Sequence, residues 1–357
     1  MKKIIVYFLF LFFCLSTCCQ NSKIEFVKYS GFDYYSIYDS VYENIDSIRF
    51  IMSSPVTPYN PTIIFLQGSG NYPLIGYFAN LDTIISFALI PPFNIEEYKN
   101  SYNFLCIAKP GTPVCVEWSN DKQLPLIDTT YLGYNIFNKM DFLDYYVSQT
   151  KQVVGHLKNN ILDGDAEIYL MGNSQGGRVA TKYVYENPKE IDRLILYSSG
   201  IVDRHHEEIL QWRQLADCGN ISDEEAQKNI DEIYKRYADL RDYVDYFRDN
   251  PEANIENVEQ HNHFMNDYTY NFDIPLNYLT EINIPILNVY GMRDLKARDN
   301  DMLPLIFTRL NKDNITIMPL PDCNHLFVRE TINDEGKIEQ EYIGDSVLVK
   351  ILQWLQE

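Results

Sequence analysis

The chain has 357 residues, and its 30 lysines and arginines face 50 acidic residues, which gives a formal charge of −20 at neutral pH. Apolar residues make up 46% of the composition, so intrinsic disorder is excluded and the chain is long enough for one large domain or two ordinary ones. The excess of negative charge argues against nucleic-acid binding, which needs a basic face, and against electrostatic attraction to anionic membranes.

The N-terminal residues are typical of a targeting segment. Lysines at positions 2 and 3 precede an uncharged run, Ile4–Leu15, which is shorter than the roughly 20 residues of a membrane span. This pattern predicts a secretory signal over residues 1–17. The following Leu15–Gln20 segment resembles the lipobox of bacterial lipoproteins. The resemblance implies a lipid anchor on Cys18, with Cys19 as the alternative, and hence export to the periplasmic or outer-membrane face of the cell envelope. An ordinary signal peptide with incidental cysteines is the other interpretation.

The next segments predict a mostly parallel sheet. Short, aromatic-rich stretches within Ile24–Met52 favour antiparallel edge strands. Compact apolar runs, typical of strands buried on both faces, then alternate with helix-length stretches such as Phe142–Lys158 and Gly176–Asn187. The predicted fold class is therefore α/β, with helices on both faces of the sheet. The runs are Thr62–Leu66, Asn103–Ala108, Glu167–Met171, Leu194–Tyr197, Ile286–Tyr290 and Ile315–Met318.

One interval breaks this alternation. Residues 201–283 carry helical patterns without a strand, which predicts a helical lid between a core of residues 18–200 and its continuation, residues 284–357. Ser222 and Glu225 have the spacing of a capping box within it. Residues 201–280 hold 18 acidic and 7 basic residues, a net charge of −11. Near the C-terminus, the turn signal Asn333–Gly336 predicts a hairpin, and a last helix is expected from about Ser346 to Leu355.

A catalytic motif follows one predicted strand directly. The strand Glu167–Met171 runs into Gly172–Gly177, which reads Gly-Asn-Ser-Gln-Gly-Gly, and a helical pattern begins at Arg178. A serine on so tight a turn exposes its hydroxyl, and the flanking glycines let strand and helix approach closely. The helix N-terminus adds partial positive charge where an oxyanion would form. Ser174 is therefore the predicted nucleophile.

The strand, motif and helix together resemble the α/β-hydrolase superfamily. The resemblance implies an acid and a histidine after later strands, in the order Ser, Asp, His. Asp294 follows the strand Ile286–Tyr290, and His325 follows the last strand, so these two are the expected partners. Asp299 and Asp301 are the rival acids.

The resemblance also implies an oxyanion hole of two backbone N–H groups. One is that of Gln175, directly after the nucleophile, and the other lies in the loop that begins at Gln67. Ser69 is the expected second donor, with Gly70 as the alternative.

We expect a lidded serine hydrolase that cleaves an ester or another acyl bond through an acyl-enzyme, with no cofactor and no metal. The alternatives are a serine peptidase or acyl-aminoacyl hydrolase of the same fold and a non-catalytic binding lipoprotein. The acidic lid predicts that the substrate is a small molecule or peptide that is not strongly anionic. Lys109 lies at the same sheet edge, where it would bind either a substrate carboxylate or a neighbouring acid. Two histidine pairs, His205–His206 and His261–His263, are read as solvated lid residues rather than metal ligands.

Overall fold

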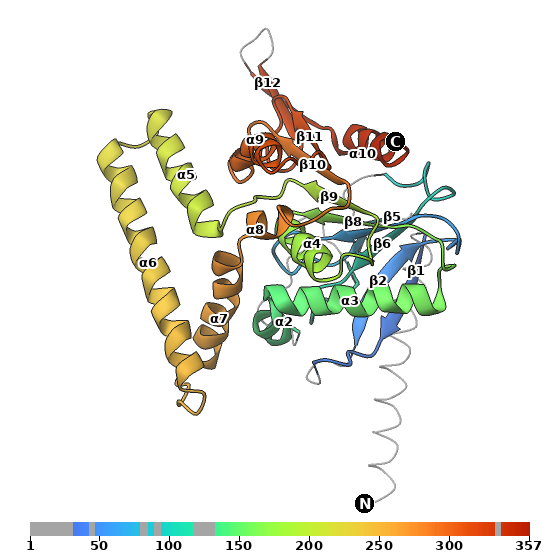
Figure 1. Ribbon diagram of the computed structural model, residues 1–357, viewed down its shortest axis with the longest axis horizontal. Coiled ribbons are helices and arrows are strands. Elements are labelled where there is room, and N and C mark those ends of the chain that lie inside the picture. Colours follow the sequence, from blue (N-terminus) through green and yellow to red (C-terminus); the bar gives the residue numbers. More distant parts are fainter. Residues whose placement is uncertain (1–30, 43–46, 79–84, 89–93, 118–132, 333–336) are drawn as a thin grey trace, which may run out of the picture.

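The computed structural model describes residues 31–42, 47–78, 85–88, 94–117, 133–332 and 337–357 (Figure 1). The predicted signal segment and Cys18 lie outside them. A central eight-stranded sheet has the order β1-β2-β6-β3-β8-β9-β10-β11. Its strands are β1 (Phe32–Ile37), β2 (Ile48–Ser53), β3 (Thr62–Leu66), β6 (Asn103–Ile107), β8 (Ile168–Asn173), β9 (Arg193–Tyr197), β10 (Ile286–Gly291) and β11 (Ile315–Leu320).

The sheet is mostly parallel, as the sequence predicts. β1 pairs antiparallel with β2, and β2 pairs antiparallel with β6, which confirms the antiparallel edge. From β6 to β11 every pair is parallel, and Ile64 of β3 lies between Leu105 of β6 and Leu170 of β8. The carboxyl ends of these strands therefore meet at one edge, where open α/β sheets hold their functional sites.

Alternating side chains on the strands build two cores. Ile64 and Leu66 of β3 pack into one cluster, together with the helices α3 (Leu143–Asn160), α4 (Gln175–Glu186) and α9 (Leu303–Arg309). Ile63 and Phe65 face the opposite cluster, which includes the last helix, α10 (Gly344–Leu355). A strand buried on both faces needs apolar residues at every position, which is why its sequence reads as a continuous run.

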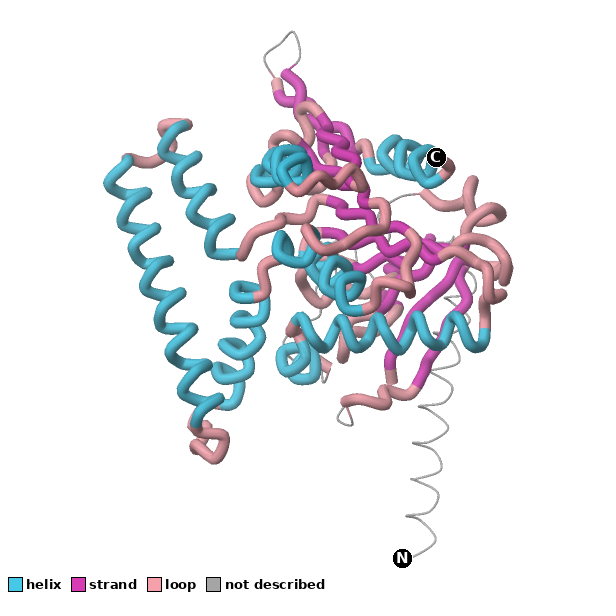
Figure 2. Tube along the Cα trace, in the orientation of Figure 1, coloured by secondary structure: helices cyan, strands magenta, loops and turns pink. Residues whose placement is uncertain are grey.

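Four helices lie between β9 and β10, and we refer to residues 201–283 as the insertion. They are α5 (Arg204–Asp217), α6 (Asp223–Asp249), α7 (Val258–Phe272) and α8 (Pro275–Leu279). Ser222 caps α6 by accepting a hydrogen bond from the backbone N–H of Glu225 at 3.1 Å, as the capping-box spacing predicts. Figures 1 and 2 show α5 and α6 side by side, away from the sheet, whereas α7 and α8 return to the core.

Several smaller elements complete the described chain. A second sheet, β5-β4-β7, was not predicted, since its strands are only three or four residues long: β4 (Ile75–Phe78), β5 (Ile85–Ala88) and β7 (Cys115–Glu117). The short helices α2 (Tyr134–Met140) and η1 (Arg298–Met302) were not predicted separately either. The hairpin is present as β12 (Val328–Ile332) and β13 (Ile338–Tyr342), and its turn residues lie outside the described ranges. Among the helices described, none combines the length and apolarity of a membrane span.

Candidate active site

Ser174 sits at a strained turn between β8 and α4. Its backbone has φ 50° and ψ −113°, a conformation that non-glycine residues rarely adopt and that typically costs about 1–3 kcal/mol. Two contacts hold the turn from behind. The N–H of Ser174 donates to the carbonyl of Tyr197 at 3.0 Å, and the Ser199 hydroxyl donates to the carbonyl of Ser174 at 3.0 Å. The neighbouring strand β9 and the residues after it thus fix the serine at the sheet edge.

The glycines of the motif are required by close backbone contacts. A Cβ atom at Gly172 would lie 2.3 Å from the carbonyl oxygen of Gly176. A Cβ at Gly176 would lie 2.1 Å from the carbonyl oxygen of Leu66, at the end of β3. The helix α4 therefore packs directly against two strand ends, and this brings its N-terminus behind Ser174.

Replacing Gly176 with alanine is expected to destabilise the protein by at least about 2 kcal/mol, because the added methyl group meets backbone that cannot rotate away. The matched control is Gly155→Ala in the middle of α3, where an added Cβ meets nothing within 4 Å. That variant should gain about 0.5–1 kcal/mol through helix propensity. Urea unfolding measures both. Equal effects of the two substitutions would show that the close approach at Gly176 is not rigid.

The structure brings Asp294 and His325 into contact. The Nδ1 atom of His325 lies 2.8 Å from Oδ2 of Asp294, whose side chain is fully buried, while the imidazole remains 26% exposed. The other carboxylate oxygen, Oδ1, accepts from the backbone N–H of Lys296 at 2.9 Å. With Nδ1 donating to the carboxylate, the neutral ring carries its free lone pair on Nε2. A histidine held in this way is suited to act as a base.

The rival acids are engaged elsewhere. Asp301 accepts a hydrogen bond from the hydroxyl of Tyr290. Asp299 lies 3.7 Å from the ring of His206 on α5. Asp322, which is close to His325 in sequence, forms an ion pair with Arg293 at 2.7 Å. Of these acids, Asp294 is the one that contacts the histidine.

Ser174 and His325 line the same cavity, which has a volume of about 480 Å³. In the described residues the Ser174 hydroxyl makes no hydrogen bond to the ring, and unliganded catalytic pairs are often long before substrate binds. The remaining walls are mainly aromatic and aliphatic. They are formed by Gln67, Gly68, Ser69, Tyr72, Asn173, Tyr197, Lys296, Leu326, Phe327, Val328 and Tyr342.

The loop expected to complete the oxyanion hole lies beside the nucleophile. Ser69 lines the cavity, and Gly68 approaches so closely that a Cβ there would lie 3.4 Å from the Cβ of Ser174. Gln67 ties the loop to β6 by donating from Nε2 to the carbonyl of Ile107 at 3.2 Å. As the first residue of α4, Gln175 has a backbone N–H without an intrahelical acceptor.

Lys109 lies next to Gln175, and the described residues do not supply the neighbouring acid that the sequence offered as one partner. It is only 4% exposed and is not among the described residues that line the catalytic cavity, and its ammonium has no carboxylate within 4 Å in the part described. Instead it donates to the side-chain oxygen of Gln175, whose amide nitrogen donates to Asp141 at 3.0 Å. Burial lowers the pKa of Lys109 to about 8, although Asp141 opposes this shift. This buried chain holds the Gln175 side chain, a role the sequence did not indicate.

The histidines of the insertion are not all solvated, which corrects the expectation for His205. That ring is buried and contacts the side-chain oxygen of Asn271 at 2.7 Å. His261 packs against the rings of Tyr243 and Phe247. In the described ranges, no three His, Cys, Asp or Glu side chains are grouped so that they would hold a metal ion.

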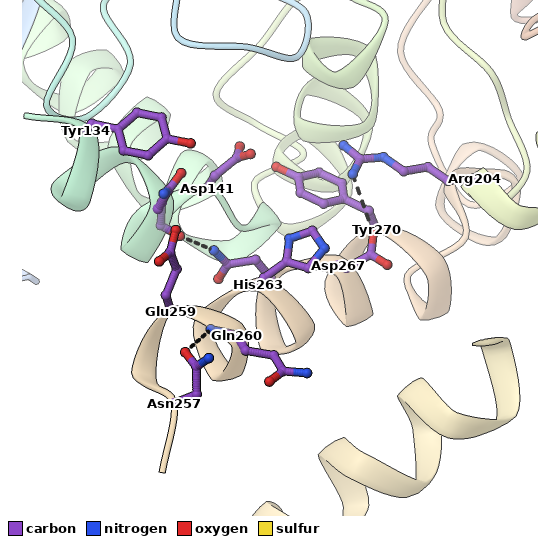
Figure 3. A pocket seen from close by; sticks show the side chains of 11 residues that line it. Tyr134, Asp141, Arg204, Asn257, Glu259, Gln260, His263, Asp267 and Tyr270 are labelled. Carbon is purple, nitrogen blue, oxygen red and sulfur yellow. Dashed lines mark hydrogen bonds and ion pairs between the residues drawn. The ribbon is translucent and has the colours of Figure 1, made fainter. Parts of the chain in front are cut away.

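A second, polar pocket of about 370 Å³ lies between α2 and α7 (Figure 3). His263 and Glu259 line it beside Arg204, which pairs with Asp267 at 3.7 Å. Asp141, which accepts a hydrogen bond from the side chain of Gln175, also lines this pocket.

Comparison with known proteins identifies the fold. No protein family and no curated protein matches the chain by sequence. The structure is similar to a highly thermostable carboxyl esterase from Bacillus coagulans, with 13% identity over 91% of this chain and 98% of the esterase and a TM-score of 0.51. It also matches an acylaminoacyl peptidase from Pyrococcus horikoshii, with 14% identity over 85% of this chain and a TM-score of 0.45. The chain spans 39% of the length of that peptidase. The likeness to the esterase and the mostly parallel eight-stranded sheet show that the fold is that of the α/β hydrolases.

Proposed function

We propose that this protein is a serine hydrolase that cleaves an ester or another acyl bond through an acyl-enzyme. The observation that carries the proposal is the contact between Asp294 and His325 on strand ends that face the same cavity as the strained Ser174. A serine, a histidine and a buried carboxylate in this chain order match the roles that nucleophilic acyl transfer requires.

In the proposed mechanism the hydroxyl of Ser174 attacks an acyl carbonyl while Nε2 of His325 removes its proton. The same nitrogen then returns the proton to the leaving group, and water releases the acyl chain by the reverse sequence. Asp294 keeps the ring in the productive tautomer and stabilises the imidazolium. The backbone N–H groups of Gln175 and Ser69 would stabilise the oxyanion, each contributing about 3 kcal/mol.

Asp294→Asn tests the role of the acid. The amide keeps the shape of the side chain but donates toward the ring, so it stabilises the wrong tautomer, and kcat for 4-nitrophenyl acetate should fall by about 10⁴-fold. The exposed Asp322→Asn, also close to His325 in sequence, serves as the control and should retain activity. A fall of less than tenfold in Asp294→Asn would remove this carboxylate from the mechanism.

Export and lipid anchoring through Cys18 belong to the same proposal and are supported by the sequence pattern alone. Radiolabelled palmitate incorporation into the wild-type chain, compared with Cys18→Ala and Cys19→Ala, would decide which cysteine is modified.

The insertion is proposed to act as a lid, because it follows β9 directly at the edge that holds the nucleophile.

A further inference from the structure

The described lining of the cavity that holds Ser174 carries a single permanent charge. Among the described residues that line it, Lys296 is the one with a fixed cation, and no aspartate or glutamate is present. Its other walls are aromatic rings, aliphatic side chains and neutral polar groups. Lys296 itself is exposed, so it lies at the edge of the cavity, where its ammonium can meet an anion that enters while the apolar walls exclude part of the water around that anion.

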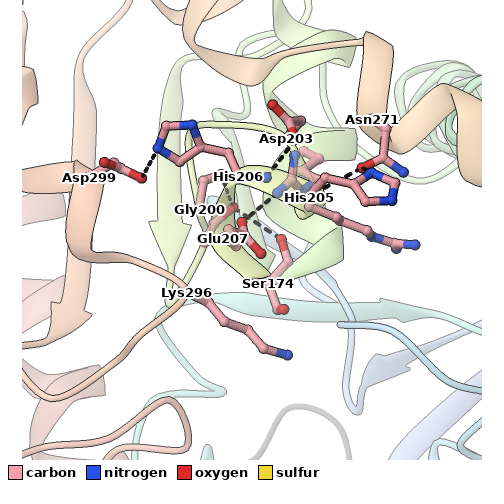
Figure 4. A network of polar contacts seen from close by, with 12 residues as sticks. Ser174, Gly200, Asp203, His205, His206, Glu207, Asn271, Lys296 and Asp299 are labelled. Carbon is pink, nitrogen blue, oxygen red and sulfur yellow. Dashed lines mark hydrogen bonds and ion pairs between the residues drawn. The ribbon is translucent and has the colours of Figure 1, made fainter. Parts of the chain in front are cut away.

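The ammonium of Lys296 is not engaged by the acids near it. Burial raises the pKa of Glu207, and the charges of Arg178 and Lys296 oppose that rise, so Glu207 is within electrostatic reach of the lysine. However, Glu207 pairs with Arg178 at 2.5 Å. Asp294 pairs with His325. In the part of the chain that is described, no carboxylate lies within 4 Å of the Lys296 ammonium. Figure 4 shows this side chain extending beside Ser174 and away from Asp299.

The backbone of Lys296 is fixed relative to the catalytic residues. Its N–H donates to Oδ1 of Asp294, the carboxylate that also binds His325. Its carbonyl packs so closely on Gly200 that a Cβ there would lie 2.6 Å from the oxygen. The backbone of the loop after β10 is therefore already ordered, so only the side chain of Lys296 has to lose freedom when it binds a ligand.

From these three observations we propose that Lys296 is a specificity-determining residue that binds one carboxylate of the substrate while Ser174 attacks an acyl carbon nearby. This inference rests on the proposed function and names a substrate class for it: an acyl compound with an apolar chain and a single carboxylate. It refines the expectation from the acidic insertion. The net charge of −11 acts over a distance, is screened by salt and disfavours multiply charged anions, whereas Lys296 acts at contact.

Matched ester pairs test the inference. Mono-4-nitrophenyl adipate carries a carboxylate on the acyl side, and 4-nitrophenyl hexanoate is its neutral counterpart. On the leaving-group side, 4-(butyryloxy)benzoate is compared with its methyl ester. The quantity measured is the ratio of kcat/KM for the charged to the neutral member of each pair. Because the leaving groups of the second pair differ in acidity, the contribution of the carboxylate is taken from the change in each ratio between the wild type and a variant, in which the chemical difference cancels.

Three variants remove, invert or keep the positive charge at this position. In Lys296→Met, the charged-to-neutral ratio of kcat/KM should fall about tenfold for one of the two ester pairs, mainly through KM. In Lys296→Glu, the same ratio should fall about 100-fold. Lys296→Arg should keep this ratio within threefold of the wild-type value. The control is Arg298→Met, which removes an exposed positive charge two residues away that does not line the cavity and should leave both ratios unchanged.

The outcomes separate this inference from the proposed function. If the wild type hydrolyses the neutral esters with dependence on Ser174 but Lys296→Met changes neither ratio, the lysine is not a specificity residue and the hydrolase proposal stands. If no ester is hydrolysed, calorimetric titration of Ser174→Ala with monomethyl adipate and dimethyl adipate provides the second readout. If Ser174→Ala binds monomethyl adipate more tightly than dimethyl adipate, and Ser174→Ala/Lys296→Met does not, the carboxylate site is supported. If Ser174→Ala binds the two esters equally, the inference is overturned.

Discussion

Ser174→Ala is expected to lower hydrolysis of 4-nitrophenyl acetate by at least about 10⁴-fold and to abolish labelling by a fluorophosphonate probe. The alanine keeps the fold of the turn but removes the atom that forms the acyl-enzyme, so neither the ester nor the probe finds a nucleophile. Steady-state rates and fluorescent labelling in a gel measure the two effects. Circular dichroism and the unfolding midpoint verify that the variant is folded.

His325→Ala should also lose labelling, because without the base the hydroxyl stays protonated and weakly nucleophilic. Ser36→Ala, on the exposed face of the edge strand β1, provides the serine control and should label like the wild type. Persistent labelling of Ser174→Ala would place the nucleophile at another residue and would withdraw the proposed mechanism.

Glu207→Ala should cost about 3–5 kcal/mol of stability. Glu207 on α5 pairs with Arg178 on α4 at 2.5 Å, and the two side chains are 10% and 4% exposed. Burial raises the pKa of Glu207 and lowers that of Arg178, so both ions are held at a cost that only their mutual attraction offsets. Removing the acid leaves a buried guanidinium unpaired. Urea unfolding gives the free energy.

Its neighbour provides a matched control. Glu208 pairs with Arg236 at 2.5 Å, but these side chains are 42% and 56% exposed, so Glu208→Ala should change stability by less than about 1 kcal/mol. The double variant Arg178→Met/Glu207→Leu removes both charges and should be more stable than Glu207→Ala alone. A similar loss in Glu207→Ala and Glu208→Ala would show that burial of the pair does not determine its contribution.

The features that could be predicted from sequence were those fixed by local patterns. A strand covered on both faces must be apolar throughout, so β3 could be placed at Thr62–Leu66 without error. The turn at Ser174 requires glycines at close backbone contacts, so its position is visible as a motif. Because topology brings strand ends together, the chain order of Asp294 and His325 was enough to predict that the two would meet.

The remaining features depend on contacts between distant segments. Lys109 and Gln175 are far apart in the chain, and no local signal shows that the lysine is buried against the amide rather than an acid. The burial of His205 depends on how α5 packs on α7, which helical periodicity does not determine. Lys296 was overlooked as well, although its place two residues after Asp294 is a usable signal, because the loop that holds the acid also faces the cavity.

The hairpin β12–β13 forms part of one wall of the cavity. Val328 and Tyr342, at its base, line the cavity. All five residues of β13 are exposed and its backbone pairs with β12, while the Tyr342 side chain also hydrogen-bonds to Tyr197 of β9. Ser174, Asp294 and His325 lie outside this hairpin. The outer face of β13 is therefore the part of the hairpin where substitutions should disturb the sheet least, whereas Val328 and Tyr342 shape the cavity itself. For protein engineering, the hairpin is the segment to exchange when a new substrate is wanted.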